Sequence, residues 1–159
     1  MIKSVIKGYG YYVPENVVTN DDLSKLMTTN DEWITERTGI KERRHRKNRN
    51  DSEETTAFLA KKAAEKALEK ANLTAKDLDF IVFATLSPDY FFPGSGVVLQ
   101  EMLGCDTIGA LDVRNQCSGF VYSMSVADAF IKAGTYKNIL VVGAEVHSFG
   151  LDFTDDGRG

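Results

Sequence analysis

Five consecutive apolar residues, Phe80-Ile-Val-Phe-Ala84, constrain the fold of this 159-residue chain more than any other feature. Apolar side chains at both odd and even positions indicate a strand that is buried on both faces, as in the centre of a parallel sheet. Residues 138–146 form a second run of this kind, and residues 108–113 also have the composition of a strand. Helices that alternate with such strands predict an α/β fold, in which helices cover both faces of a parallel sheet.

The clearest predicted helix extends from Asp51 to Asn72. Asp51 and Glu54 have the spacing of a capping box at its start. Small and apolar side chains recur along it at helical spacing, at Ala60, Ala63, Ala64, Ala67, Leu68 and Ala71. Further helices are predicted over 96–103 and over 117–133, the second ending at Gly134. We expect this last helix to pack on the sheet through Val121, Met124, Ser125, Ala129 and Phe130 or Ile131.

The N-terminal third is predicted to contain shorter elements. Residues 2–9 have the composition of a buried strand interrupted by glycine. The segment Thr19-Asn-Asp-Asp22 is predicted to cap a short helix that carries Leu23 and Leu26. A second short helix is predicted from Asn30 to a C-terminal Gly39, followed by a short strand over 40–45.

The overall composition is that of an ordinary globular protein, with 43% hydrophobic and 26% charged residues. The net charge of −4 argues against a nucleic-acid-binding protein, because such domains are usually basic. The sequence shows neither an apolar run of membrane-spanning length nor the apolar segment of a signal peptide, so we expect a cytoplasmic protein without a membrane partner. Two cysteines and two histidines without close spacing predict no metal site.

Cys117 is the candidate nucleophile, because it lies where a predicted strand ends and a predicted helix begins. The positive end of a helix dipole favours a thiolate over a thiol. Ser118 and Gly119 are small, which would let a ligand approach the thiol and the backbone N–H groups that could bind an oxyanion. The alternative is that Cys117 is a small buried hydrophobic residue, as most free cysteines are.

Two long motifs resemble β-ketoacyl-ACP synthase III, a condensing enzyme with the thiolase fold. The segment Asp112-Val-Arg-Asn-Gln-Cys-Ser-Gly-Phe-Val-Tyr122 is similar to the nucleophile segment of the family. The segment Thr28-Thr-Asn-Asp-Glu-Trp-Ile-Thr-Glu-Arg-Thr-Gly-Ile-Lys-Glu-Arg43 is similar to its nucleotide-side motif. Three shorter matches follow in the expected order, at Phe92-Pro93, Met102-Leu-Gly104 and Leu140-Val-Val-Gly-Ala-Glu-Val146.

The resemblance implies a thiolase-like fold with a mixed, mostly parallel sheet flanked by helices. Residues 1–159 would be the N-terminal half, because the chain covers about the first half of a typical member and lacks the half that carries the catalytic histidine and asparagine of the family. The implied enzyme is an acyltransferase that starts fatty acid synthesis. It would load an acyl primer from coenzyme A onto Cys117 and condense it with malonyl-ACP, as a cytoplasmic homodimer that uses the coenzyme A thioester as substrate and needs no cofactor.

Trp33 and Arg37 are four residues apart and would share a helix face, on which an indole beside a guanidinium could stack an adenine and bind a phosphate. In the family the matching positions contact coenzyme A, with Thr28 nearby, and Leu86 and Phe92 match positions that shape the acyl pocket. The alternatives are a core tryptophan, a solvated arginine and two ordinary apolar residues.

Three features limit the transfer of function. Asp156 stands where some bacterial members have the arginine that completes the adenine clamp, and Arg158 follows two residues later. The basic run over 41–49 could attract phosphates or an acidic carrier protein, or be a solvated face. His147 is not expected to serve as the base for Cys117. Two alternatives therefore stay open, a related acyltransferase with another primer or acceptor, and a non-catalytic binding half.

Overall fold

The computed structural model describes residues 2–48 and 52–154. They form two compact units, each described below by itself. The larger unit consists of Met1–Tyr12 and Ser52–Glu145, and the smaller unit of Val13–Asp51 and Val146–Gly159. Within the described ranges, no helix has the length and apolar character needed to cross a membrane.

The larger unit is built on a parallel sheet with the strand order β4-β3-β5. The central strand β3 (Phe80–Ala84) pairs with β4 (Gly109–Val113) on one side and with β5 (Ile139–Gly143) on the other. All five residues of β3 are buried. The apolar run over Phe80–Ala84 is therefore the central strand, and the predicted parallel arrangement is confirmed.

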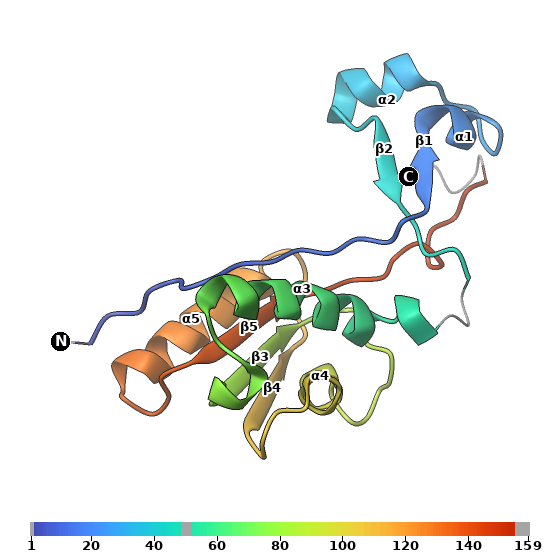
Figure 1. The fold of residues 1–159 in the computed structure, drawn as a ribbon. Coiled ribbons are helices and arrows are strands. Elements are labelled where there is room, and N and C mark those ends of the chain that lie inside the picture. Colours follow the sequence, from blue (N-terminus) through green and yellow to red (C-terminus); the bar gives the residue numbers. More distant parts are fainter. Residues whose placement is uncertain (1, 49–51, 155–159) are drawn as a thin grey trace. The chain divides into compact units, whose positions relative to one another are not determined.

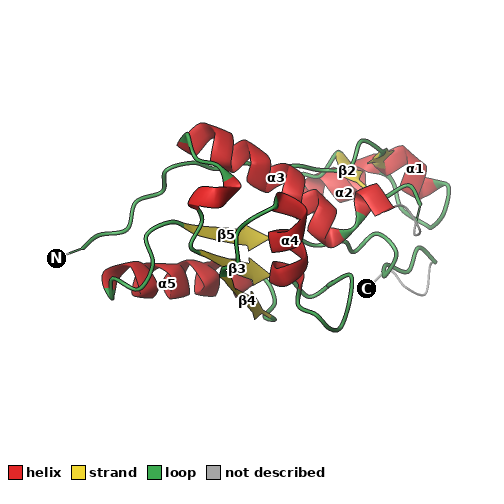
Figure 2. Cartoon of the chain, turned by 60° about the horizontal axis from the view of Figure 1, so that its bottom comes forward, coloured by secondary structure: helices red, strands yellow, loops and turns green. Residues whose placement is uncertain are grey.

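Helices cover both faces of this sheet (Figures 1 and 2). Helices α3 (Thr56–Ala71) and α4 (Ser95–Leu103) pack on one face, and α5 (Gly119–Lys132) on the other. A short 3-10 turn, η2 (Ala75–Asp77), links α3 to β3. The core between α3, α4 and the sheet consists of Ala60, Ala64, Leu68, Leu78, Ile81, Phe83, Leu99, Leu140 and Val142. On the opposite face, the Phe80 ring packs against Phe130 of α5 and stacks on Tyr136, with ring centroids 5.2 and 4.7 Å away.

Helix α5 contacts the sheet through small residues. Gly119, Ser123 and Ala127 are its buried residues and are spaced four apart, so that they form one stripe. Small side chains let the helix lie close to the sheet, and a Cβ placed on Gly119 would be 3.5 Å from the Cβ of Ala84. The prediction that Val121, Ser125 and Ala129 pack on the sheet is wrong, because these residues are exposed.

The predicted strand over residues 2–9 is also wrong. Residues 2–12 are extended but belong to neither sheet. They lie along α3, where Gly8 and Gly10 touch its backbone: a Cβ on Gly8 would be 2.8 Å from the Ala71 nitrogen, and one on Gly10 would be 2.7 Å from the Ala67 nitrogen. The glycines that resembled strand interruptions therefore allow a close contact with a helix.

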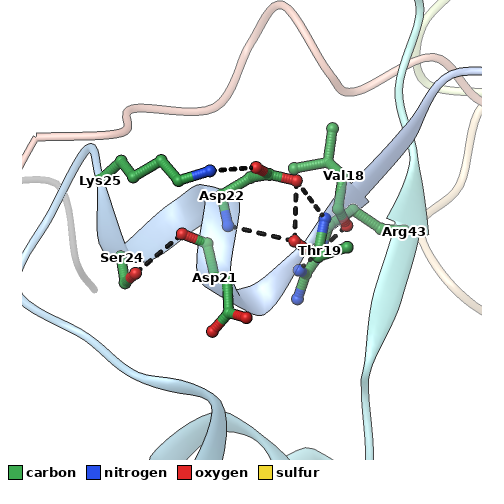
Figure 3. A network of polar contacts seen from close by, with 7 residues as sticks. All are labelled: Val18, Thr19, Asp21, Asp22, Ser24, Lys25 and Arg43. Carbon is green, nitrogen blue, oxygen red and sulfur yellow. Dashed lines mark hydrogen bonds and ion pairs between the residues drawn. The ribbon is translucent and has the colours of Figure 1, made fainter.

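The smaller unit contains an antiparallel pair, β1 (Val17–Thr19) and β2 (Glu42–Arg44), and two helices, α1 (Asn20–Ser24) and α2 (Asp31–Thr38). Thr19 caps α1 and forms a capping box with Asp22, whose other oxygen binds Lys25 at 2.7 Å (Figure 3). Asn30 caps α2, and Gly39 ends it in the left-handed region at φ 71°. The two short helices and the short strand are confirmed.

The start of α3 is later than predicted. A 3-10 turn, η1 (Ser52–Glu54), comes first, and Thr55 is the N-cap, with its side chain accepting from the Phe58 N–H at 3.2 Å. The predicted capping box of Asp51 and Glu54 cannot be placed, because Asp51 lies outside the described residues.

Candidate active site

The carboxyl ends of the three parallel strands meet at one edge of the sheet. Thr85, Leu86 and Ser87 follow β3 at this edge, residues 114–117 follow β4, and Glu145 follows β5. Cys117 is exposed and precedes Ser118, the N-cap of α5. The helix begins at Gly119, two residues later than predicted, so the thiol lies just before the helix. In the residues described, Cys117 is therefore exposed rather than buried in the core.

The N-termini of the three helices in this unit differ in charge. Asp89 accepts hydrogen bonds from the N–H groups of Thr56 and Ala57 at the start of α3, at 2.7 and 2.8 Å. Asp112, on β4, accepts from Ser95 and Gly96 at the start of α4, at 2.6 and 2.8 Å. These carboxylates neutralise the positive ends of two helix dipoles.

No carboxylate occupies the corresponding position at α5 among the described residues. The side chain of its N-cap, Ser118, makes no capping hydrogen bond and instead accepts from the Asn115 amide at 2.9 Å. The Gly119 N–H donates to the Gln116 carbonyl at 2.8 Å, which closes the turn that contains Cys117. The partial positive charge of this helix end therefore stays beside the thiol, where it would stabilise an anionic sulfur or an oxyanion.

Cys105 differs from Cys117 in environment. It packs against the hydrophobic core and is partly buried. Burial raises the pKa of the Cys105 thiol, because the apolar surroundings disfavour its thiolate. Cys105 is therefore a weaker nucleophile at neutral pH than an unperturbed thiol, and it provides an internal control for reactions of Cys117.

Leu86 lies at the carboxyl edge and is held by Glu145. Its backbone N–H donates to Glu145 Oε1 at 2.7 Å, and the N–H and hydroxyl of Ser87 donate to Oε2 at 3.0 and 2.5 Å. The Leu86 side chain is 43% exposed beside these bonds. Glu145 was not among the predicted site residues, although an acidic residue near the end of the otherwise apolar run 138–146 is a signal that could have found it.

Phe92 lies in an aromatic loop, Tyr90–Phe92, and is 87% exposed. Arg114, the first residue after β4, holds this loop. Its guanidinium lies 5.0 Å from the centroid of the Phe91 ring and donates to the Phe91 carbonyl at 3.4 Å. Leu86 and Cys117 thus follow the adjacent strands β3 and β4. Arg114 connects the loop Tyr90–Phe92 to the segment that leads to Cys117.

In the smaller unit, Trp33 and Arg37 lie together on α2, as the spacing predicted. The Arg37 guanidinium is 4.6 Å from the centroid of the indole ring. Trp33 is 42% exposed, which excludes a core anchor, and Arg37 also contacts Glu36 at 3.9 Å. Thr28 is an exposed residue between α1 and α2. The pair presents a flat, cationic surface of the kind that binds an aromatic ring beside a phosphate.

Three arginines of the basic run contact other residues of the smaller unit. Arg43 donates to the Val18 carbonyl at 3.3 Å, Arg44 to the Pro14 carbonyl at 3.4 Å, and Arg46 lies over the Phe149 ring at 5.4 Å. These arginines support β2 and its neighbours. Arg49, Asp156 and Arg158 lie outside the described residues. The effect of Asp156 and Arg158 on an adenine clamp therefore stays a prediction. In the part of the chain that is described, no three His, Cys, Asp or Glu residues form a metal-binding group.

Comparison with solved structures places the fold. The crystal structure of 3-oxoacyl-[acyl-carrier-protein] synthase III from Aquifex aeolicus is similar with a TM-score of 0.90 and 46% sequence identity, over 99% of this chain and 49% of that one. A parallel sheet whose strand β4 leads through a cysteine into helix α5 is the arrangement of the thiolase-like fold to which these structures belong.

Sequence comparison narrows the class. Residues 111–158 match the family 3-oxoacyl-[acyl-carrier-protein (ACP)] synthase III. The β-ketoacyl-[acyl-carrier-protein] synthase III of Aquifex aeolicus is 48% identical over 94% of this chain and 47% of its own length. That of Xanthomonas euvesicatoria pv. vesicatoria is 49% identical over 97% and 46%. The chain belongs to the β-ketoacyl-ACP synthase III family, and it spans about half the length of the curated relatives it matches.

Proposed function

We propose that this chain carries the acyl-loading part of a β-ketoacyl-ACP synthase III. The Cys117 thiolate attacks the carbonyl carbon of an acyl-coenzyme A. The carbonyl oxygen becomes an oxyanion, the bond from carbon to the coenzyme sulfur breaks, and coenzyme A leaves as a thiolate that takes up a proton. The observation that carries the proposal is the position of Cys117, exposed just before the N-terminus of α5, which no carboxylate among the described residues caps, in a member of this family.

The remaining site residues bind the two ends of the substrate in this proposal. Trp33 and Arg37 hold the nucleotide of coenzyme A, with Thr28 beside them, and their stacked geometry supports this role. Leu86 and Phe92 contact the acyl chain, supported by the place of Leu86 at the same sheet edge as Cys117. The coenzyme A thioester is the substrate, and the proposal needs no cofactor.

The second step is a condensation with malonyl-ACP that releases carbon dioxide and starts fatty acid synthesis. The histidine and asparagine that assist it would come from the other half of a protein in which residues 1–159 are the N-terminal half. We expect that protein to be a cytoplasmic homodimer, and the chain alone to be unable to condense.

Intact mass spectrometry tests the loading step. After incubation with acetyl-coenzyme A, the protein should gain the mass of one acetyl group. The Cys117→Ser variant should gain none on sulfur, whereas Cys105→Ser should still be labelled. Labelling that persists in Cys117→Ser, or that is lost in Cys105→Ser, would contradict the proposed nucleophile.

Two further experiments test the two alternative functions. A mixture of acyl-coenzyme A donors of different length shows which primer is preferred, so that labelling by a longer acyl group alone would favour a relative with another primer. The binding-half alternative predicts that iodoacetamide alkylates Cys117 no faster than Cys105. A clear preference for Cys117 would exclude it.

A further inference from the structure

One buried amide in the smaller unit binds the helix that carries Trp33 and Arg37. Asn20, the first residue of α1, is 1% exposed. Its Nδ2 donates to Asp31 Oδ1 and to the Ile40 carbonyl, both at 2.7 Å, and lies 3.5 Å from Thr35 Oγ1. Asp31 begins α2, and Ile40 follows the glycine that ends it. A single side chain therefore binds α2 in its first turn and the chain just after its last turn.

Asn20 contacts the face of α2 opposite the Trp33–Arg37 pair. Asp31 and Thr35 are one turn apart, joined by a 3.3 Å bond between Thr35 Oγ1 and Asp31 Oδ1, so they share a face. Residues two positions apart are rotated by about 200° on a helix, which turns Trp33 and Arg37 away from that face. The amide therefore contacts the inner side of the helix and leaves the aromatic–cationic side exposed.

Apolar burial contributes little to the placement of α2. Ile34 is the one buried residue among its eight, so apolar packing determines the orientation of the helix only weakly. By contrast, α1 is locally well fixed by the bonds among Thr19, Asp22 and Lys25 (Figure 3). The position of the Asn20 amide therefore follows from α1, and the position of α2 follows from the amide.

A contribution to the stability of the fold does not by itself explain why position 20 is an asparagine. Its Oδ1 is buried and accepts no hydrogen bond from the residues described, which costs free energy. An aspartate would bring a second carboxylate against Asp31, and an apolar residue would leave Asp31 and the Ile40 carbonyl without these donors. Only the two N–H groups of an amide match the two acceptors, which points to geometry as the reason for this residue.

We propose that Asn20 is a positioning residue that orients α2 so that Trp33 and Arg37 can hold the nucleotide of the acyl-coenzyme A. This inference rests on the proposed function of that pair. It predicts that loss of the amide weakens use of the nucleotide and leaves the chemistry at the thioester unchanged.

Two acyl donors test this in the intact protein as its gene encodes it. Acetyl-coenzyme A carries the nucleotide, and acetyl-pantetheine offers the same thioester without it. In Asn20→Ala, the second-order rate constant for acetylation by acetyl-coenzyme A should fall about 10-fold, because small misplacements of binding groups have effects of at least this size. The rate constant with acetyl-pantetheine should not change. The matched control is Asp21→Ala, an exposed neighbour on α1, which should change neither.

Equal losses with both donors, or no loss with either, would overturn the positioning role. Trp33→Ala separates this result from a failure of the proposed function. If Trp33→Ala shows no preference for one donor, the coenzyme clamp itself is wrong. Trp33→Ala could instead lower the rate constant with acetyl-coenzyme A alone while Asn20→Ala shows no such selective loss. In that case only the inference about Asn20 fails.

A second variant covers the case in which Asn20→Ala does not fold, as judged by circular dichroism. Asp31→Ala removes one of the two acceptors at an exposed position and leaves the bond to the Ile40 carbonyl. It should show the same selective loss with acetyl-coenzyme A, at smaller size. Equal responses to both donors in this variant would overturn the proposal.

Discussion

Single glycines determine how the N-terminal segment packs on α3. Gly8 and Gly10 lie against the helix backbone, where neither has room for a side chain. The contact is between main chains and therefore cannot be relieved by turning a flexible side chain. An added methyl group must instead push the segment away from the helix.

Gly10→Ala should therefore lower the free energy of unfolding of the protein by roughly 1–3 kcal/mol, the usual effect of overpacking. Denaturant unfolding followed by circular dichroism measures this. Gly150→Ala is the control, because its Cβ would meet its nearest neighbour, the His147 carbonyl, at an ordinary 3.6 Å. An alanine at position 10 as harmless as one at position 150 would show that the segment is not packed as described.

The residues that could be predicted from the sequence are those with local partners. Thr19, Asn30 and Gly39 bond to or end a helix within four residues, and their roles follow from short-range rules. Glu145 could not be predicted in this way. Its partners Leu86 and Ser87 are 59 and 58 residues away in sequence, and only the parallel sheet brings them together.

At the scale of elements, two helices obtain their N-terminal caps from distant residues. Asp112 of β4 binds two N–H groups of α4, and Asp89 binds two of α3. A carboxylate at each site joins a helix to the strand edge and offsets its dipole. The strands predicted from the apolar runs 80–84 and 138–146 are confirmed as β3 and β5, the latter shorter than predicted, because their apolar pattern reflects burial itself. Residues 2–9 show that the same composition is not enough without a paired neighbour.

Asp112→Ala should lower the free energy of unfolding by roughly 2–3 kcal/mol, because two charge-assisted hydrogen bonds are lost and two N–H groups are left partly buried. Asp106→Ala provides the comparison. It removes an exposed ion pair with Lys76 of 2.6 Å, which should be worth less than about 1 kcal/mol. Thermal and denaturant unfolding of both variants measure the difference, and equal losses would argue against the capping role of Asp112.

At the scale of the whole molecule, the candidate residues belong to two different units. Cys117 belongs to the larger unit and Trp33 and Arg37 to the smaller one. Sequence motifs could identify Cys117 and the Trp33–Arg37 pair separately, because each motif has its own residue spacing and side-chain chemistry. The sequence gives no measure of the distance between them, since no short-range rule relates residues about 80 positions apart.

The larger unit also exposes several large apolar side chains, at the start of α5 and in the loop after β3. On α5, Phe120, Val121 and Tyr122 are 47%, 62% and 55% exposed, and the loop Tyr90–Phe92 adds three aromatic side chains. Contiguous apolar patches are uncommon on monomeric proteins and mark contact surfaces. In relatives about twice as long, more polypeptide is present to cover such a surface.

Produced by itself, the 159-residue chain should therefore self-associate and bind a dye that fluoresces on apolar surfaces. Val121→Lys should reduce both, because it places a charge among the exposed apolar side chains in the first turn of α5. Sedimentation velocity and dye titration provide the measurements, with Lys132→Ala at the far end of the helix as the control. A wild-type chain that is monomeric and binds no dye would contradict this prediction.

The stripe of small residues on α5 has a consequence for how the protein could diversify. Gly119, Ser123 and Ala127 set the spacing between helix and sheet, and Cys117 is attached two residues before the first of them. Mutations that enlarge these residues would displace Cys117, the proposed nucleophile, together with the helix. Leu86 and Phe92 are exposed and can change in size without that displacement. We expect new acyl specificities to arise through the loops after β3, while the α5 stripe tolerates little variation.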